Sequence, residues 1–275
     1  MKPVDSLVAG FIGAGMMGSA LIEAAAKTID GSRITVTDSA RTNAEASASK
    51  FGCGIAGSNA ELAKKSDVIF LCVKPAQIPA VTKEIAHELT GKILVSIAAG
   101  VSLAELAEHA GAQSGAEEVI RLMPNLPAAV GEGMIALCVR KGGENTAEAV
   151  SLVKELLKKA GRIEEIPESL MDAVIAVSGS GPAYAFMFIE ALADAGVLLG
   201  MPRKQASSYA AQTLLGAAKF ALESGRHPGD LKDAVCSPAG TTIEAVRALE
   251  QRGFRSAVIE AALAAGNKSK AMTGS

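Results

Sequence analysis

The chain has 275 residues, of which 49% are hydrophobic and 20% charged, so it can bury a large core, which excludes a disordered protein. A formal net charge of −2 gives no basic excess, and we expect no nucleic-acid partner. The four cysteines form no C-x-x-C pair, which predicts reduced thiols and no metal site. Lys2 alone is basic before the first apolar run, unlike a signal peptide, and no apolar run approaches the roughly 18 residues of a membrane span. We therefore expect a cytoplasmic protein with no membrane partner.

The first motif is a glycine-rich turn between an apolar strand and a helix. Residues 8–12 are apolar, Gly13-Ala14-Gly15-Met16-Met17-Gly18 forms a complete G-x-G-x-x-G, and an Ala-rich helix is expected over 19–29. A second strand, 33–37, ends at Asp38, twenty residues beyond Gly18. In a dinucleotide-binding unit the glycines admit the pyrophosphate at the helix N-terminus, and such an acidic residue holds the ribose hydroxyls. The pattern predicts a dinucleotide site. The alternative is a glycine-rich turn without a ligand.

The rest of the first half alternates strands with helices. This alternation indicates an open parallel sheet with right-handed crossovers, and hence an N-terminal Rossmann-type domain over residues 1–166. Because ligands bind such sheets at the carboxyl ends of the strands, the loops 13–18, 38–41, 73–77 and 98–100 should share one rim. The further predicted strands are 53–56, 67–73, 92–97, 118–123, 134–139 and 162–166, and the helices are 40–50, one opened by 58–61, 77–89, one begun by Ser102, and 146–160.

From Pro167 onward the pattern predicts helices only. We expect an all-α C-terminal domain over 167–275, with helices at 169–177, 183–199, 203–222, 228–235, 243–252 and 256–272. The segment 178–182 should form a sharp break before the helix 183–199. That helix is apolar on nearly all sides, so it is expected to be buried between partners rather than to lie on a surface. This predicts a homodimer.

A hydroxyl-rich turn, Ser237-Pro238-Ala239-Gly240-Thr241-Thr242, opens the helix 243–252. Backbone N–H groups and hydroxyls at a helix N-terminus suit a small carboxylate. On these residues alone a plain helix cap is favoured. Lys74, at the end of a strand, is expected to steer phosphate charge or to be solvated rather than to donate a proton.

The sequence resembles the pyrroline-5-carboxylate reductase family over essentially the whole chain. The residues that carry this resemblance are 174–184, 227–229, 231–233 and 237–242 in the second half, and 11–15, 73–75 and 98–101 in the first. The resemblance implies reduction of L-1-pyrroline-5-carboxylate to L-proline by hydride transfer from NADPH or NADH, the final step of proline biosynthesis. It also implies a homodimer with interlaced helical domains, which can assemble into a larger homo-oligomer.

The resemblance further implies a set of site residues. Ser237, Gly240, Thr241 and Thr242 would bind the substrate, with Thr242 at the ring nitrogen as the catalytic residue. Ala239 departs from the family pattern, which has glycine there. The residues expected to bind the cofactor are Gly13, Ala14, Gly15, Met16, Met17, Gly18, Ser39, Arg41, Asn59, Val73, Lys74, Pro75, Ala98, Ala99 and Gly100.

The residues after the second strand give opposing indications about whether the cofactor is NADH or NADPH. The Asp38 carboxylate would repel a 2′-phosphate and favour NADH. The Ser39 hydroxyl, the Arg41 guanidinium and nearby N–H groups could bind that phosphate. We predict a moderate preference for NADP(H), with NAD(H) as a substitute, Asp38 turned aside from the phosphate and Arg41 over the adenine edge.

Two other functions compete with this interpretation. Another imine or hydroxyacid reductase could share the two-domain plan, but a hydroxyacid dehydrogenase should carry a lysine on the helix 183–199, which has none. A dinucleotide-sensing regulator would need a DNA-reading module or a basic stripe, and neither is visible in the sequence.

Overall fold

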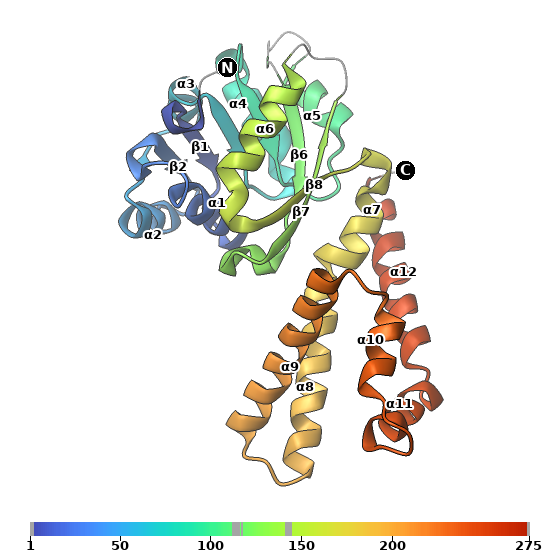
Figure 1. Cartoon of the computed structure of the whole chain (residues 1–275). Coiled ribbons are helices and arrows are strands. Elements are labelled where there is room, and N and C mark those ends of the chain that lie inside the picture. The colour runs from blue at the N-terminus through green and yellow to red at the C-terminus, as the bar shows by residue number, and fades with distance from the viewer. Residues whose placement is uncertain (1–2, 112–115, 117, 141–144, 274–275) are drawn as a thin grey trace. The chain divides into compact units, whose positions relative to one another are not determined.

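The computed structural model describes residues 3–111, 116, 118–140 and 145–273. They form two compact units. The first contains the chain up to Gly179 together with the residues from Ala265 on, and the second contains Ser180–Ala264. Figure 1 shows the chain.

The first unit is built on an eight-stranded sheet with the order β3-β2-β1-β4-β5-β6-β7-β8. All neighbouring pairs from β3 to β6 are parallel, as the alternating pattern predicts. The reversal of strand order beside β1 creates the crevice where such sheets bind ligands. The strands are β1 (Ala9–Ile12), β2 (Ile34–Thr37), β3 (Gly54–Ile55), β4 (Val68–Leu71), β5 (Ile93–Ser96), β6 (Glu118–Met123), β7 (Gly133–Val139) and β8 (Gly161–Glu165).

The edge of the sheet departs from the expected parallel arrangement. β7 runs antiparallel to β6, and β8 then pairs with β7 in parallel. The connection between β6 and β7 is a 3₁₀ turn, Leu126–Val130, closed by Gly131 with φ of 80°. A parallel neighbour needs a crossover of a dozen or more residues, so a turn this short returns the chain antiparallel. The prediction of a wholly parallel sheet was wrong at this edge.

Helices cover both faces of the sheet. On one face α1, α2 and α6 bury their apolar side chains against strand residues such as Phe11 and Phe70, whose rings stack with centroids 4.5 Å apart. On the other face α3, α4 and α5 pack on Ile12, Leu71 and Leu94. Each large side chain buried in this way stabilises the fold by roughly 1.5–3 kcal/mol. The helices are α1 (Met16–Ala26), α2 (Arg41–Phe51), α3 (Asn59–Lys65), α4 (Ile78–Ile85), α5 (Leu103–His109) and α6 (Thr146–Leu157).

The predicted break at 178–182 is a π-helical turn rather than a gap between helices. Residues Ile175–Gly179 form this turn, after α7 (Met171–Val174) and before α8 (Gly181–Leu198). The side chain of Asn125 holds the turn, because its Nδ2 donates to the Ser178 carbonyl and hydroxyl at 3.1 and 3.2 Å. Its Oδ1 accepts the Met134 N–H at 3.0 Å, so one amide joins the start of β7 to the π turn.

The second unit is helical. It contains α8, α9 (Arg203–Ser224), α10 (Pro228–Val235), α11 (Thr241–Gln251) and the first part of α12 (Phe254–Thr273). α8 and α9 pack through Ala193, Ala206 and Ala210, whose small side chains are buried. The described parts of both units therefore confirm a Rossmann-type sheet domain followed by helices.

Several large apolar side chains of α8 are exposed in the single chain. Phe186, Met187 and Leu198 are 54%, 69% and 88% exposed. The stretch Glu168–Leu198 is long and apolar enough to cross a membrane, contrary to the expectation from sequence. It carries Glu190 and Asp194 among these residues. An apolar helix in a soluble assembly passes the same test when another protomer covers it.

Candidate functional site

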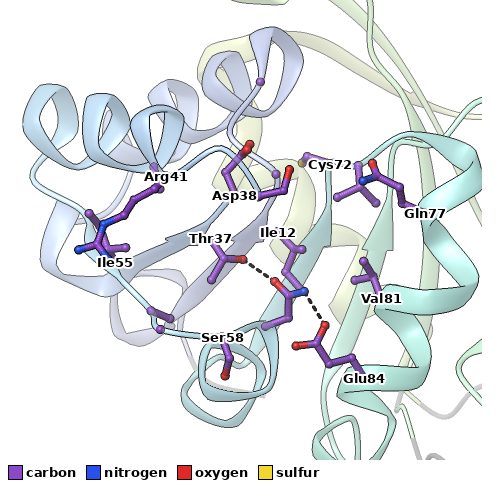
Figure 2. Close-up of a pocket in the computed structure, with 18 of the residues that line it drawn as sticks. Ile12, Thr37, Asp38, Arg41, Ile55, Ser58, Cys72, Gln77, Val81 and Glu84 are labelled. Atoms are coloured by element: carbon purple, nitrogen blue, oxygen red, sulfur yellow. Dashed lines mark hydrogen bonds between the residues drawn. The ribbon is translucent and has the colours of Figure 1, made fainter.

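A cavity of about 710 Å³ opens at the carboxyl ends of β1, β2 and β4 in the first unit (Figure 2). Of the predicted cofactor residues, its lining includes Gly13, Gly15, Ser39, Arg41, Asn59, Val73 and Lys74. It also includes residues that sequence reasoning missed, among them Thr37, Ile55, Gln77, Val81 and Glu84. Three of the four predicted rim loops thus meet at one cavity.

The three glycines of the motif have distinct environments. Gly13 has φ of 100°, and a Cβ there would lie 2.6 Å from the Cys72 carbonyl oxygen. A Cβ on Gly18 would lie 2.2 Å from the Gly13 carbonyl oxygen, so this position keeps helix and turn in contact. A Cβ on Gly15 would meet nothing within 4 Å. The open space at Gly15 is where a pyrophosphate can approach the backbone, so the loop fits a dinucleotide.

The helix after the glycine loop begins earlier than predicted, at Met16 rather than Ser19. Gly15 is its N-cap, and no side chain caps it. The N–H groups of the first turn, which includes Met16, Met17 and Gly18, have no partner within a helix and suit an anion. The Ala14 N–H is different, since it donates to Asp38 Oδ2 at 2.7 Å. The Ala14 N–H is therefore already hydrogen-bonded to the Asp38 side chain.

Asp38 is held by the protein itself. Besides the Ala14 contact, its Oδ1 accepts the Ala40 N–H at 2.7 Å and the Asn43 Nδ2 at 3.3 Å. Arg41 starts α2 and pairs with Glu45 at 2.9 Å, with its side chain 84% exposed. Figure 2 shows Asp38 and Arg41 extending from the same end of β2. The carboxylate is turned into the glycine loop, while the guanidinium is accessible.

A hydrogen-bonded chain crosses the cavity from β2 to α4. The Thr37 hydroxyl donates to Asn59 Oδ1 at 2.8 Å, and Asn59 Nδ2 donates to Glu84 Oε2 at 2.8 Å. The two dashed lines in Figure 2 mark these bonds. Thr37 and Asn59 are 22 positions apart in sequence, and Asn59 and Glu84 are 25 positions apart. No local pattern could have linked them, and only the sheet order, in which β1 pairs with both β2 and β4, brings them together.

Of the two remaining predicted rim loops, the one after β4 lines the cavity and the one after β5 does not. Val73 and Lys74 line the cavity, and Pro75 opens the 3₁₀ turn Pro75–Gln77 that follows them. The fourth predicted rim loop, Ala98-Ala99-Gly100, follows β5 and is not among the residues lining this cavity. Ala98 is buried, and Gly100 has φ of 76°.

The predicted substrate turn opens α11 in the second unit. The Gly240 N–H donates to the Ser237 carbonyl at 3.0 Å, with Pro238 second and Ala239 third in the turn. Ala239 has φ of 55°, a conformation that favours glycine and is the pattern of a type II turn. A Cβ on Gly240 would lie 2.2 Å from Ser237 Oγ. A side chain at position 240 would therefore displace the Ser237 hydroxyl.

The turn presents polar groups at a helix N-terminus. Gly240 is the N-cap of α11, and no side chain caps it. Thr241 and Thr242 follow as the first two helical residues, so their N–H groups have no carbonyl partner within the helix. With the Ser237 hydroxyl this turn can bind a carboxylate. The same features define a helix start, which is the alternative that the sequence left open.

Other reactive groups take no part in these two sites. Among the residues that the structure describes, no group of three His, Cys, Asp or Glu side chains could hold a metal ion. Burial raises the pKa of the Cys53 thiol to about 11 and that of Cys138 to about 12. His227 caps α10, where its Nδ1 accepts the Gly229 N–H at 3.0 Å.

Two family models match the chain. Residues 168–272 match pyrroline-5-carboxylate reductase dimerisation, and residues 8–100 match NADP oxidoreductase, coenzyme F420-dependent. The first match covers the helices with the exposed apolar side chains, and the second covers the glycine loop and all residues that line the cavity. The chain thus has an NADP-binding domain and a dimerisation domain, and the latter indicates a homodimer.

Similar proteins match over nearly the full length. The pyrroline-5-carboxylate reductase of Escherichia coli is 47% identical over 256 residues, which cover 92% of this chain and 93% of the relative. That of Pisum sativum is 42% identical, with 98% and 97% covered. The crystal structure of Plasmodium falciparum pyrroline carboxylate reductase with NADP bound superposes with a TM-score of 0.85 at 34% identity, covering 98% of this chain and 99% of the other. A pyrroline-5-carboxylate reductase from Coxiella burnetii gives a TM-score of 0.87 at 31% identity, with 98% and 99% covered. The glycine loop, the turn before α11 and these matches together place the chain in the pyrroline-5-carboxylate reductase family.

Proposed function

We propose that this protein reduces L-1-pyrroline-5-carboxylate to L-proline with NADPH, the final step of proline biosynthesis. The observation that carries the proposal is membership of the family across both units, so that the nucleotide cavity and the hydroxyl-rich turn occur in one chain. NADH serves as a substitute cofactor.

The cavity of the first unit holds the dinucleotide. Gly13, Gly15 and the first turn of α1 take the pyrophosphate, and Ala14 supports the loop through Asp38. When bound, the reduced nicotinamide supplies the hydride. The other residues assigned to cofactor binding are Met16, Met17, Gly18, Ser39, Arg41, Asn59, Val73, Lys74, Pro75, Ala98, Ala99 and Gly100.

The turn before α11 binds the substrate. N–H groups of Thr241 and Thr242 and the Ser237 hydroxyl hold the carboxylate, because donors at a helix N-terminus favour an anion. Gly240 closes the turn and leaves room for the Ser237 hydroxyl. Thr242 is the catalytic residue and makes a hydrogen bond with the ring nitrogen. It is half-buried at the second position of α11, so the helix backbone fixes the point from which its side chain extends.

The reaction requires no strong acid from the protein. The imine nitrogen of the substrate is basic enough to arrive protonated, and the cationic carbon accepts hydride directly, giving L-proline and the oxidised cofactor. The protein aligns the two reactants and excludes water. Orientation of this kind can lower a barrier by roughly 7–11 kcal/mol.

We also propose the domain division, the assembly and the compartment. Residues 1–166 form the dinucleotide-binding domain and residues 167–275 the substrate-binding and dimerisation domain, since β8 ends at Glu165 and the dimerisation match begins at residue 168. The homodimers assemble into a larger homo-oligomer, and the protein is cytoplasmic.

One assay tests the function. Purified protein is mixed with NADPH and L-1-pyrroline-5-carboxylate, and the loss of absorbance of the reduced cofactor is followed with proline as the product. Turnover of a 2-ketoacid, or of another cyclic imine in preference to this one, would support the related reductases instead. Cofactor binding without turnover of any imine would support a sensor.

A further inference from the structure

The two hydrogen bonds that join Thr37, Asn59 and Glu84 have a fixed donor-to-acceptor direction. An ionised carboxylate only accepts hydrogen bonds, so the Asn59 atom facing Glu84 must be Nδ2. This places Asn59 Oδ1 toward the Thr37 hydroxyl, which donates to it. With the amide rotated by half a turn, Oδ1 would face a carboxylate oxygen at 2.8 Å. Glu84 therefore determines which way the Asn59 amide points.

The chain lies at the adenosine end of the cavity. Thr37 is the last residue of β2 and precedes Asp38, the position that faces the adenosine ribose in dinucleotide-binding folds. Asn59 is the first residue of α3, and Glu84 lies near the end of α4. Three separate elements thus support one side chain.

The two hydrogen bonds of the Asn59 amide leave one of its N–H bonds outside them. An amide nitrogen has two N–H bonds, and the contact with Glu84 uses one of them. The second N–H of Asn59 is fixed in direction by the other contacts. A donor whose direction is already set binds at a lower entropic cost than one that must be ordered on binding.

We infer that Glu84 and Thr37 are positioning residues for the cofactor, which act by fixing the Asn59 amide so that it donates to the adenosine half of NADPH. The inference rests on the proposed function, because it deepens the cofactor site assigned there. It goes beyond the sequence, which pointed to Asn59 alone.

The test measures cofactor binding without turnover. Dissociation constants for NADPH and for adenosine 2′,5′-bisphosphate, a fragment without nicotinamide, are measured by calorimetry. Glu84→Ala, Thr37→Val and Asn59→Ala should each weaken both ligands about tenfold, which is the scale of one hydrogen bond. The KM for NADPH should rise while kcat and the KM for the imine stay near wild type. Thr37→Ser should retain binding, and Glu108→Gln, an exposed change on α5, is the control.

A double-mutant cycle separates positioning from direct contact. If Glu84 acts through Asn59, the variant with both residues changed to alanine should bind no worse than Asn59→Ala alone. Additive losses, or unchanged binding in Glu84→Ala, would overturn the inference. A wild-type protein that binds the fragment and NADPH but does not reduce the imine would contradict the proposed function and leave the cycle valid. A wild type that does not bind NADPH would contradict both.

Discussion

The carboxylate of Asp38 accepts the backbone N–H of Ala14 with 2.7 Å between Oδ2 and N, so the acidic residue at the end of β2 supports the glycine loop. In a site built for NADH such a carboxylate would hold the ribose hydroxyls. Here both oxygens already accept N–H groups of the protein. This arrangement supports the expected preference for NADPH.

The first prediction concerns Arg41 and cofactor choice. Arg41→Ala should lower kcat/KM for NADPH about tenfold and leave that for NADH near wild type, because one charge-assisted hydrogen bond to the 2′-phosphate contributes roughly 1.5–3 kcal/mol. The measurement is kcat/KM for both cofactors. Lys50→Ala, at the last turn of the same helix, is the control. An equal loss of kcat/KM for the two cofactors, or a wild type that prefers NADH, would show that Arg41 does not bind the 2′-phosphate.

The second prediction concerns Thr242. Thr242→Ala should lower kcat/KM for the imine at least tenfold, about 1.4 kcal/mol of transition-state stabilisation, since the ring nitrogen loses its hydrogen bond. Affinity for NADPH should not change. Thr242→Ser keeps the hydroxyl and should retain most of the activity. Normal steady-state kinetics in the alanine variant would exclude this role.

The third prediction concerns the strain at Ala239. Its φ of 55° costs a residue with a Cβ roughly 1–2 kcal/mol, which glycine avoids. Glycine adds about 0.4–1 kcal/mol of entropy to the unfolded chain, so Ala239→Gly should raise the free energy of unfolding by roughly 0.5 kcal/mol. The matched control is Ala245→Gly, an exposed change inside α11, which should lower it by about 1 kcal/mol. Both are measured by urea denaturation at one protein concentration. Destabilisation by both changes would contradict the left-handed conformation.

The fourth prediction concerns pH. Burial raises the pKa of the Cys53 and Cys138 thiols to about 11 and 12, above the value of 9.0 for a thiol without burial. Above pH 9 the unfolded chain therefore binds fewer protons at these thiols than the folded chain. The stability that they contribute is complete below pH 9 and is lost as the pH rises toward 11–12.

Urea denaturation at pH 8, 9 and 10 should therefore show a decline that begins near pH 9. Burial also raises the pKa of the Cys72 thiol to about 12, so three thiols contribute to this decline. The variant Cys138→Ala should show a shallower decline than wild type, because one of the three is gone. Cys236→Ala, at a half-buried position, is the control. Identical slopes in all three proteins would mean that other groups cause the decline.

The fifth prediction concerns the exposed face of α8. Sedimentation at micromolar concentration should show a dimer, since Phe186, Met187 and Leu198 are each more than half exposed in the single chain. Met187→Lys should weaken the dimer by introducing a charge into the interface. Val130→Lys, equally exposed but outside the dimerisation segment, should not. A folded and active wild-type monomer would contradict the obligate dimer.

The sequence predicted those parts of the fold that depend on local pattern. The glycine loop, the strands of the parallel sheet and the Ser58 and Ser102 caps follow from spacing within about twenty residues, and the structure contains them. The predicted direction of β7 was wrong, because the connection through the turn Leu126–Val130 is too short for a parallel crossover. The chain from Thr37 to Glu84 was missed because its members meet only through sheet order. The roles of Ser237 and Thr242 came from family resemblance and remain predictions.

The end of the chain belongs to the first unit, where Ser269 donates to Asp172 and Met272 lies beside Gly100. The first compact unit is thus discontinuous in sequence: it includes residues 167–179 and 265–275, which the proposed domain division assigns to the substrate-binding domain. Its last segment is synthesised after the whole helical unit. A fragment that stops at Gly179 would leave Asp172 and the loop at Gly100 without these neighbours. To obtain the nucleotide-binding unit alone, residues 265–275 should be joined to Gly179 through a short linker or added as a separate peptide.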